Sequence, residues 1–370
     1  MSIDLSLLLP LNNENRWSDL LATLIAADPE PARALLGLPA GQVQVRREYS
    51  ASKTDRPDIV IRVNGDLRVV LEAKVLSGIG PRQLDRYAAS SPDADRYVLT
   101  HLAVLPVDTH DSPAWSTVTW EQLIAAYAAS HDTWCAQSAG AWGEHITRAV
   151  PPVDSTTRWN DLPDGVLFAT AIRTRMAWLA GAVSPPEGVS AVLATSAKGD
   201  SAILAMSADT PVAQYRVSCA VEEARDVSEW PGIVSESTIG PRGPFVAVRL
   251  EQFGITTSRG YNWRHLAALW PTLRDTGFAW RTRGPRKNTE HDRAGVQLLA
   301  DAGVPKYVGR GFGEGQVKHS ASCMFGPEFD ISADSTLGEI ATALDEVAVL
   351  VRDLAAMPAP TSTIDPAVNC

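Results

Sequence analysis

Long apolar runs are missing from this chain of 370 residues, and no segment approaches the roughly 18 apolar residues that a membrane-spanning helix needs. Positive charge is missing from its start, MSIDLSLLLPL, which has an acid at Asp4 where a signal peptide would be basic. These two absences predict a cytoplasmic protein that does not enter a membrane.

Cysteine is scarce, and the four cysteines (positions 135, 219, 323 and 370) lie far apart. They show neither the close pairs of a zinc site nor the density of a disulfide scaffold. The seven histidines form no HExxH motif, and neither a GxSxG elbow nor a GxxxxGK[ST] loop is present. The sequence therefore argues against a zinc hydrolase, an α/β-hydrolase and a nucleotide-driven motor.

Acidic residues outnumber basic ones by 43 to 33, and a net charge of −10 argues against a protein that coats nucleic acid non-specifically. One stretch, residues 259–318, is nevertheless basic. After Trp280 it concentrates four cations: Arg281, Arg283, Arg286 and Lys287. Such groups neutralise phosphates, and an exposed tryptophan can stack on an unpaired base. The stretch is a candidate nucleic-acid-binding surface, and the alternative is a solvated loop beside a helix whose tryptophans, Trp263 and Trp270, belong to the core.

Length and composition, with 45% hydrophobic and 21% charged residues, predict two packed domains. The polar, proline-rich segment 150–157 marks the boundary, so we expect domains over residues 1–150 and 151–370. In the first we expect a helix (13–27), three strands (42–49, 57–63, 67–74), a helix opened by Pro81, a strand (97–104) and a helix capped by Thr119 and Gln122. In the second, helices at 167–179, 263–274 and 336–355 accompany β-like segments at 190–197, 202–207, 214–222 and 245–251, which predicts an α+β domain.

The second and third strands bring acids together only under one condition. The Asn-Gly pair at 64–65 predicts an antiparallel hairpin, and Glu72 and Lys74, two residues apart, share a strand face. A strict two-residue turn puts Asp58 opposite Leu71, and the two acids then lie on opposite faces. Asp58 faces Glu72 only if a longer loop or a bulge supplies one more residue.

If that condition holds, the two carboxylates repel each other unless a cation lies between them. Oxygen ligands with open positions suit Mg²⁺ or Mn²⁺, and Lys74 beside the ion can hold or help deprotonate a water. The alternative is that Glu72 and Lys74 form the solvent face of an edge strand. The apolar run around them favours burial, where both groups need a function or a partner. Glu14 extends the apolar stripe of the first helix and also needs a partner.

These residues resemble the PD-(D/E)xK nuclease superfamily over about residues 10–130, through Pro57-Asp58, Glu72-Ala73-Lys74, Glu14, and Gln83 with Tyr87. The resemblance implies an α/β restriction-endonuclease-like core, a mixed central sheet flanked by helices, followed by the second, α+β domain. It also implies that Asp58, Glu72 and Glu14 bind Mg²⁺ (or Mn²⁺), that Lys74 serves the attacking water, and that Gln83 orients the substrate or the site.

The function expected from this resemblance is metal-dependent hydrolysis of DNA phosphodiester bonds, in restriction, phage defence or repair, with RNA left open as a substrate. Such enzymes often pair up to cut both strands, so a homodimer or a partner protein is expected, and no membrane. The second domain would recognise substrate, a partner or a regulatory state. The alternative is an inactive protein that kept the nuclease fold and serves as a nucleic-acid-binding or assembly module.

Overall fold

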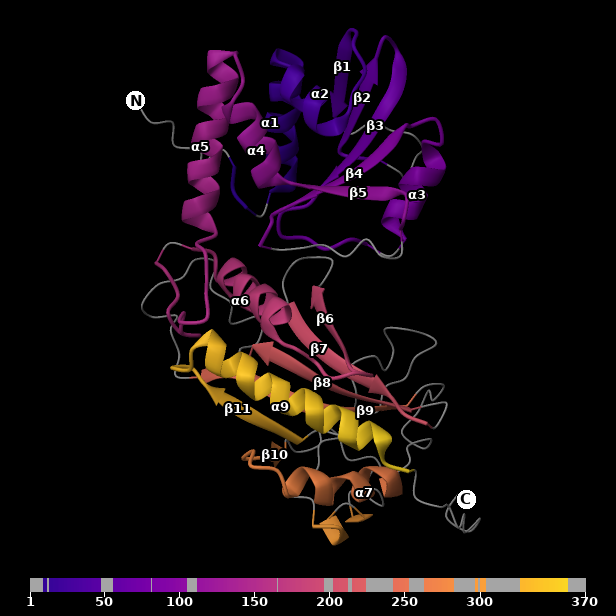
Figure 1. Cartoon of the computed structure of the whole chain (residues 1–370), viewed down its shortest axis with the longest axis vertical. Coiled ribbons are helices and arrows are strands. Elements are labelled where there is room, and N and C mark those ends of the chain that lie inside the picture. The colour runs from indigo at the N-terminus through magenta and orange to yellow at the C-terminus, as the bar shows by residue number, and fades with distance from the viewer. Residues whose placement is uncertain are drawn as a thin grey trace.

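The structure is a computed structural model that describes residues 9–11, 13–47, 56–80, 82–104, 112–164, 166–195, 202–211, 215–223, 242–252, 263–282, 297–298, 300–303 and 327–358. It contains two sheets, each with its own helices, stacked along the long axis of the molecule (Figure 1). We call the described residues up to 149 the N-terminal lobe and those from 150 onward the C-terminal lobe. Among the described residues, no helix is both long and apolar enough to cross a membrane.

The N-terminal sheet is mixed. Its order is β1-β2-β3-β4-β5, antiparallel from β1 to β3 and parallel from β3 to β5. The strands are β1 (Val43–Arg47), β2 (Ile59–Val63), β3 (Asp66–Ala73), β4 (Arg96–His101) and β5 (Trp115–Thr119). The parallel arrangement brings the carboxyl ends of β3, β4 and β5 to one edge of the sheet.

Helices cover both faces of this sheet (Figure 1). Ile59, Ile61 and Leu71 point to the face covered by α1 (Glu14–Ala27), α2 (Glu30–Leu36), α4 (Trp120–Ala128) and α5 (Thr133–Ala149). Val60 and Val70 point to the opposite face, where α3 (Gln83–Ser90) packs on them. Because side chains alternate along a strand, Glu72 and Lys74 follow Val70 onto the α3 face.

Three tryptophans from three helices form the centre of the larger core. Trp17 lies 5.3 Å from Trp120 and 5.5 Å from Trp142, measured between ring centroids, and all three are fully buried. Gly143 allows α5 to approach α4 closely, since a Cβ there would lie 3.3 Å from Cγ2 of Ile124. This core holds α1, and with it Glu14, against the sheet.

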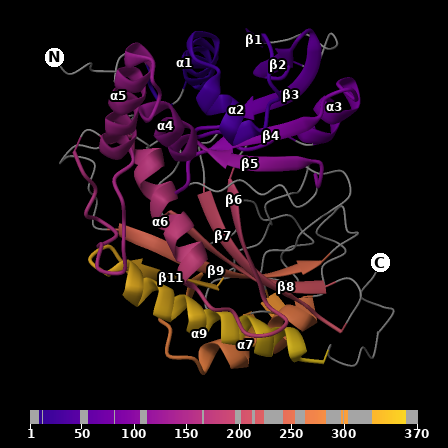
Figure 2. The same ribbon diagram turned by 45° about the horizontal axis from the view of Figure 1, so that its top comes forward.

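The C-terminal sheet is antiparallel throughout, in the order β10-β11-β9-β8-β7-β6. Its strands are β6 (Ser190–Thr195), β7 (Ala202–Asp209), β8 (Tyr215–Glu223), β9 (Arg242–Gln252), β10 (Arg281–Thr282) and β11 (Pro327–Ser332). On one face of the sheet lie α6 (Phe168–Ala182) and α9 (Leu337–Ala356), and α7 (Trp263–Arg274) packs beside α9 (Figure 2).

Two segments tie the lobes together. Helix α6 is buried on nearly every side, because it packs on the second sheet while Leu167 and Ala177 also pack against the core of the N-terminal lobe. The proline-rich segment before it starts with Val150, which is buried in the core of the N-terminal lobe, and is then bound to α9: the N–H of Leu337 donates to the Thr157 carbonyl at 2.8 Å and that of Gly338 to the Ser155 carbonyl at 2.9 Å. These bonds satisfy helix N–H groups that otherwise lack a partner.

The expectation of a mixed α/β part followed by an α+β part is confirmed at that level, and the order of predicted helices and strands agrees with the structure. Both predicted capping boxes, Thr119 with Gln122 and Thr336 with Glu339, are present. The helices α2 and α5 and the strands β5, β10 and β11 were not predicted. Pro81 lies outside the described residues, and α3 begins at Gln83.

Candidate active site

The hairpin between β2 and β3 closes through a strict two-residue turn. Asn64 and Gly65 have φ values of 54° and 92°, and Val63 pairs directly with Asp66. Positive φ at both central residues is typical of the turn that matches the twist of a hairpin. If this register continued, Asp58 and Glu72 would lie on opposite faces of the sheet.

A β-bulge corrects the register before the acids are reached. The pairing shifts by one residue at Arg68, which has no partner on β2, so that Ile59 pairs with Leu71. Asp58, one residue before Ile59, therefore lies opposite Glu72. The guanidinium of Arg68 is held by ion pairs of 2.9 and 2.8 Å to Asp66 and Asp95. The bulge that the sequence required is confirmed.

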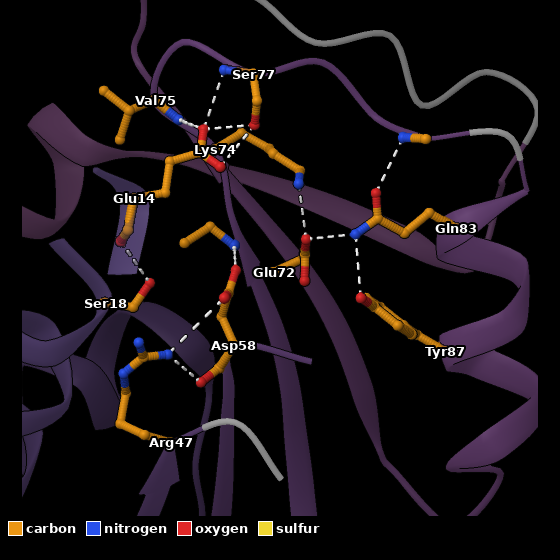
Figure 3. A network of polar contacts seen from close by, with 12 residues as sticks. Glu14, Ser18, Arg47, Asp58, Glu72, Lys74, Val75, Ser77, Gln83 and Tyr87 are labelled. Carbon is orange, nitrogen blue, oxygen red and sulfur yellow. Dashed lines mark hydrogen bonds and ion pairs between the residues drawn. The ribbon is translucent and has the colours of Figure 1, made fainter. Parts of the chain in front are cut away.

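Glu72 and Lys74 form a buried ion pair at the carboxyl end of β3 (Figure 3). Nζ of Lys74 lies 2.8 Å from Oε1 of Glu72, and the two side chains are only 9% and 4% exposed. The pair is not the solvent face of an edge strand, since β3 is central in the sheet. Asp58 lies beside the pair, and its Oδ2 accepts a hydrogen bond of 2.8 Å from the N–H of Ala73.

The electrostatics of the site are dominated by burial and by acids close together. Burial, and then the charge of Asp58, raise the pKa of Glu72 to about 8, against the opposing effect of Lys74. Burial also raises the pKa of Asp58, although the Ala73 N–H and Lys74 favour its charged form. Burial alone would lower the pKa of Lys74, but Glu72 outweighs it and the pKa of Lys74 is raised. Lys74 is therefore a cation at neutral pH.

Gln83 connects helix α3 to Glu72. Its Oε1 accepts a hydrogen bond from the N–H of Gly80 at 3.0 Å, which turns its amide Nε2 toward the site. Nε2 donates to Oε1 of Glu72 at 2.7 Å and to the hydroxyl of Tyr87 at 3.1 Å. Gln83 thus positions the same Glu72 oxygen that Lys74 binds (Figure 3).

Glu14 fastens α1 to the chain that leaves β3. Its Oε1 accepts from the N–H groups of Val75 and Ser77 at 2.7 and 3.1 Å, and the Ser77 hydroxyl lies 2.6 Å from both carboxylate oxygens. The partner that we expected for Glu14 is therefore the segment Val75–Ser77, which follows β3. Its predicted role as a metal ligand stays a prediction.

Two further residues hold this region, and the sequence analysis did not single them out. Arg47 of β1 donates to the Asp58 carbonyl at 2.6 Å and pairs with Asp19 at 2.8 Å. Arg173 of α6, 2% exposed, donates from Nη1 to the carbonyl of Leu76. An arginine at an inward strand position, and an arginine inside a mostly apolar helix, are signals that could have identified them.

The donor set can be compared with what a divalent ion needs. Oε2 of Glu72 is buried and has no hydrogen-bond partner in the described part of the chain, which leaves a carboxylate oxygen open beside Asp58. Among those same residues, no three His, Cys, Asp or Glu side chains converge. Two carboxylates suit Mg²⁺, which retains waters and takes substrate phosphate oxygens as its remaining ligands. They do not suit zinc, which is held by three or four protein ligands.

The predicted nucleic-acid surface is largely outside the described residues. Arg283, Arg286 and Lys287 lie there, and Arg281 contributes its backbone to β10. Trp280, which precedes them, is half-buried: its indole N–H donates to the Leu273 carbonyl at 2.8 Å and its ring packs on Phe329. Trp280 thus packs against the core of the C-terminal lobe, and Trp270 of the neighbouring helix α7 is buried in that core, as the alternative interpretation expected of the helix tryptophans.

Comparisons with protein families, with curated proteins and with solved structures find no match for this chain. The arrangement of the site's own residues is therefore what a functional assignment rests on.

Proposed function

We propose that the chain is a metal-dependent nuclease of the PD-(D/E)xK kind that hydrolyses DNA phosphodiester bonds. The proposal includes the finer fold assignment: a mixed sheet, covered by helices on both faces, with its acids on an antiparallel hairpin is like the core of that superfamily. One observation carries it. A bulge at Arg68 brings Asp58 beside Glu72, whose buried Oε2 has no partner among the described residues, with Lys74 at 2.8 Å from the other oxygen.

The alternatives for these residues explain less. A structural ion pair between Glu72 and Lys74 would leave Asp58 unexplained, because a second buried acid raises the cost of the first. A buried, partly unsatisfied polar group is expensive for folding, and such costs are typical of functional sites.

Each residue has a role that follows from its contacts. Asp58 and Glu72 would hold Mg²⁺ (or Mn²⁺), which when bound supplies the charge that lowers the pKa of a water and offsets charge on a phosphate. Lys74, a cation, orients a water by hydrogen bonding and stabilises negative charge that develops on the phosphate, and it does not accept a proton. Gln83 holds the Glu72 carboxylate in its orientation.

The test is incubation of the wild type and Lys74→Ala with single-stranded, duplex and supercoiled DNA, in Mg²⁺, in Mn²⁺ and in EDTA. We expect cutting only with metal, and its loss in Lys74→Ala with the fold retained by circular dichroism. Arg352→Ala is the matched control, since it removes a cation that is 47% exposed on α9, and it should cut like the wild type. Cutting that persists in EDTA, or in Lys74→Ala, would refute the assignment.

The absence of cutting by either protein, together with DNA binding that survives EDTA, would instead favour the inactive nucleic-acid-binding module. The two outcomes differ in whether a metal ion is required, because only the nuclease needs a cation that Asp58 and Glu72 hold together.

A further inference from the structure

Three exposed arginines of the N-terminal lobe are neighbours, in sequence or in strand register, of the residues that form the site. Arg46 is on β1, Arg56 lies two residues before Asp58, and Arg82 directly precedes Gln83. No hydrogen bond or ion pair joins these three side chains to the described part of the chain. Several other arginines of this lobe are engaged, as in the 3.1 Å ion pair of Arg33 with Glu30 and the hydrogen bond of 2.9 Å from Arg96 to the Leu36 carbonyl.

The register of the sheet puts Arg46 on the same face as the site. Arg46 pairs with Val60, which is two residues from Asp58 on β2 and points to the α3 face. Diagonal neighbours on adjacent strands lie about 7–8 Å apart, well within the reach of an arginine side chain. Arg46 is exposed there, on the face that carries Glu72.

Arg82 adopts a backbone conformation that is unfavourable for arginine and that glycine adopts readily. Its φ of 54° lies in the left-handed region, and among the described non-glycine residues only Asn64 shares it. Asn64 belongs to a hairpin turn, where this conformation is usual. An arginine held there costs free energy, and such strain is typical of functional positions. Its neighbour Gln83 donates to Glu72 at 2.7 Å.

The positive charge of these arginines can offset the repulsion between the acids of the site and DNA phosphates. Acidic side chains at the site, among them Asp58 and, once it is charged, Glu72, repel the phosphates of an approaching DNA strand, so cations outside the acids favour binding. Guanidinium groups are suited to this, because their planar donors match phosphate oxygens and they stay charged at every pH of interest. Exposed arginines without partners contribute little to stability.

We propose that Arg46, Arg56 and Arg82 bind phosphates of a DNA strand on either side of the phosphodiester that faces Asp58 and Glu72. This inference rests on the proposed function, and it assigns substrate binding to the N-terminal lobe itself. The basic stretch of the C-terminal lobe is then not the main contact of the scissile strand.

The experiment measures binding without cleavage. Affinity of the full-length chain for a fluorescent DNA duplex is determined by anisotropy in EDTA over a series of salt concentrations. The variants are Arg46→Ala, Arg56→Ala and Arg82→Gly, with Arg352→Ala as the control. Glycine suits the left-handed backbone at position 82, so Arg82→Gly removes the guanidinium without loss of stability.

We expect each of the three variants to bind DNA more weakly, irrespective of sequence, and to lower the slope of log affinity against log salt by about 0.9. Arg352→Ala should match the wild type. Slopes equal to the control, or no DNA binding by the wild type, would overturn the inference. A preference for an RNA duplex of the same sequence would overturn the commitment to DNA.

The two proposals fail differently. DNA binding that depends on the three arginines, without metal-dependent cutting, would refute the proposed nuclease activity and support the proposed DNA-binding surface. Metal-dependent cutting, together with DNA binding that is unchanged in the three arginine variants, would support the nuclease activity and refute the DNA-binding surface.

Discussion

The raised pKa of Glu72 makes a quantitative prediction about metal binding. A carboxylate must lose its proton before it can bind a divalent ion, so binding below the pKa releases a proton. The pKa of Glu72 is about 8 because the group is buried beside Asp58. As pH rises toward 8, more of the wild type has Glu72 charged, and the affinity for Mn²⁺ should rise with it.

The magnitude follows from one released proton. Affinity should increase by about tenfold per pH unit, or about 1.4 kcal/mol, and by somewhat under a hundredfold from about pH 6 to about pH 8. Above about pH 8 it should level off. Lys74 adds no proton to this count because its raised pKa keeps it charged, whereas the raised pKa of Asp58 can only steepen the dependence at the acidic end.

The assay is calorimetric titration with Mn²⁺ in buffers of different ionisation enthalpy, which counts released protons. Glu72→Gln should bind Mn²⁺ weakly and lose this pH dependence. Glu346→Gln, an exposed acid on α9, should behave like the wild type. A wild-type affinity that is constant from about pH 6 to about pH 8, without proton release, would show that Glu72 is not a protonated ligand of the ion.

Trp17→Ala empties a fully buried site beside Trp120 and should lower the free energy of unfolding by about 3–5 kcal/mol in urea titrations, and a loss below 1 kcal/mol would contradict this packing. Glu14→Gln keeps an oxygen for the N–H of Val75 but removes the carboxylate, so with Glu14 as a ligand calorimetry should find Mn²⁺ affinity lowered by more than about threefold, whereas a smaller change would limit Glu14 to its contacts with Val75 and Ser77. Arg173→Met removes the donor to the Leu76 carbonyl and should cost about 1–3 kcal/mol in urea titrations and reduce cleavage, which Arg173→Lys should partly restore. Unchanged cleavage in Arg173→Met would mean that α6 does not support the site.

Local patterns predicted much of the fold. The apolar stripe of α1, the Asn64-Gly65 hairpin and the capping box at Thr119 each depend on residues within a few positions of one another, and all are present. The helix α5 escaped the same analysis, because TWCAQSAGAWGEHITRA contains two glycines and many small residues. Its glycine at position 143 serves contact with α4, a need that arises only in the packed core.

The sequence by itself determined which chemistry was available: two acids and a lysine on neighbouring strands, and the condition under which the acids meet. Only the tertiary structure decided that the extra residue is a bulge at Arg68, that Glu14 binds the backbone that follows β3, and that Arg173 reaches Leu76 from the other lobe. The physical reason is the range of the interactions. Turns and caps depend on neighbours in the chain, whereas register and burial depend on groups that meet only when sheets and helices pack together.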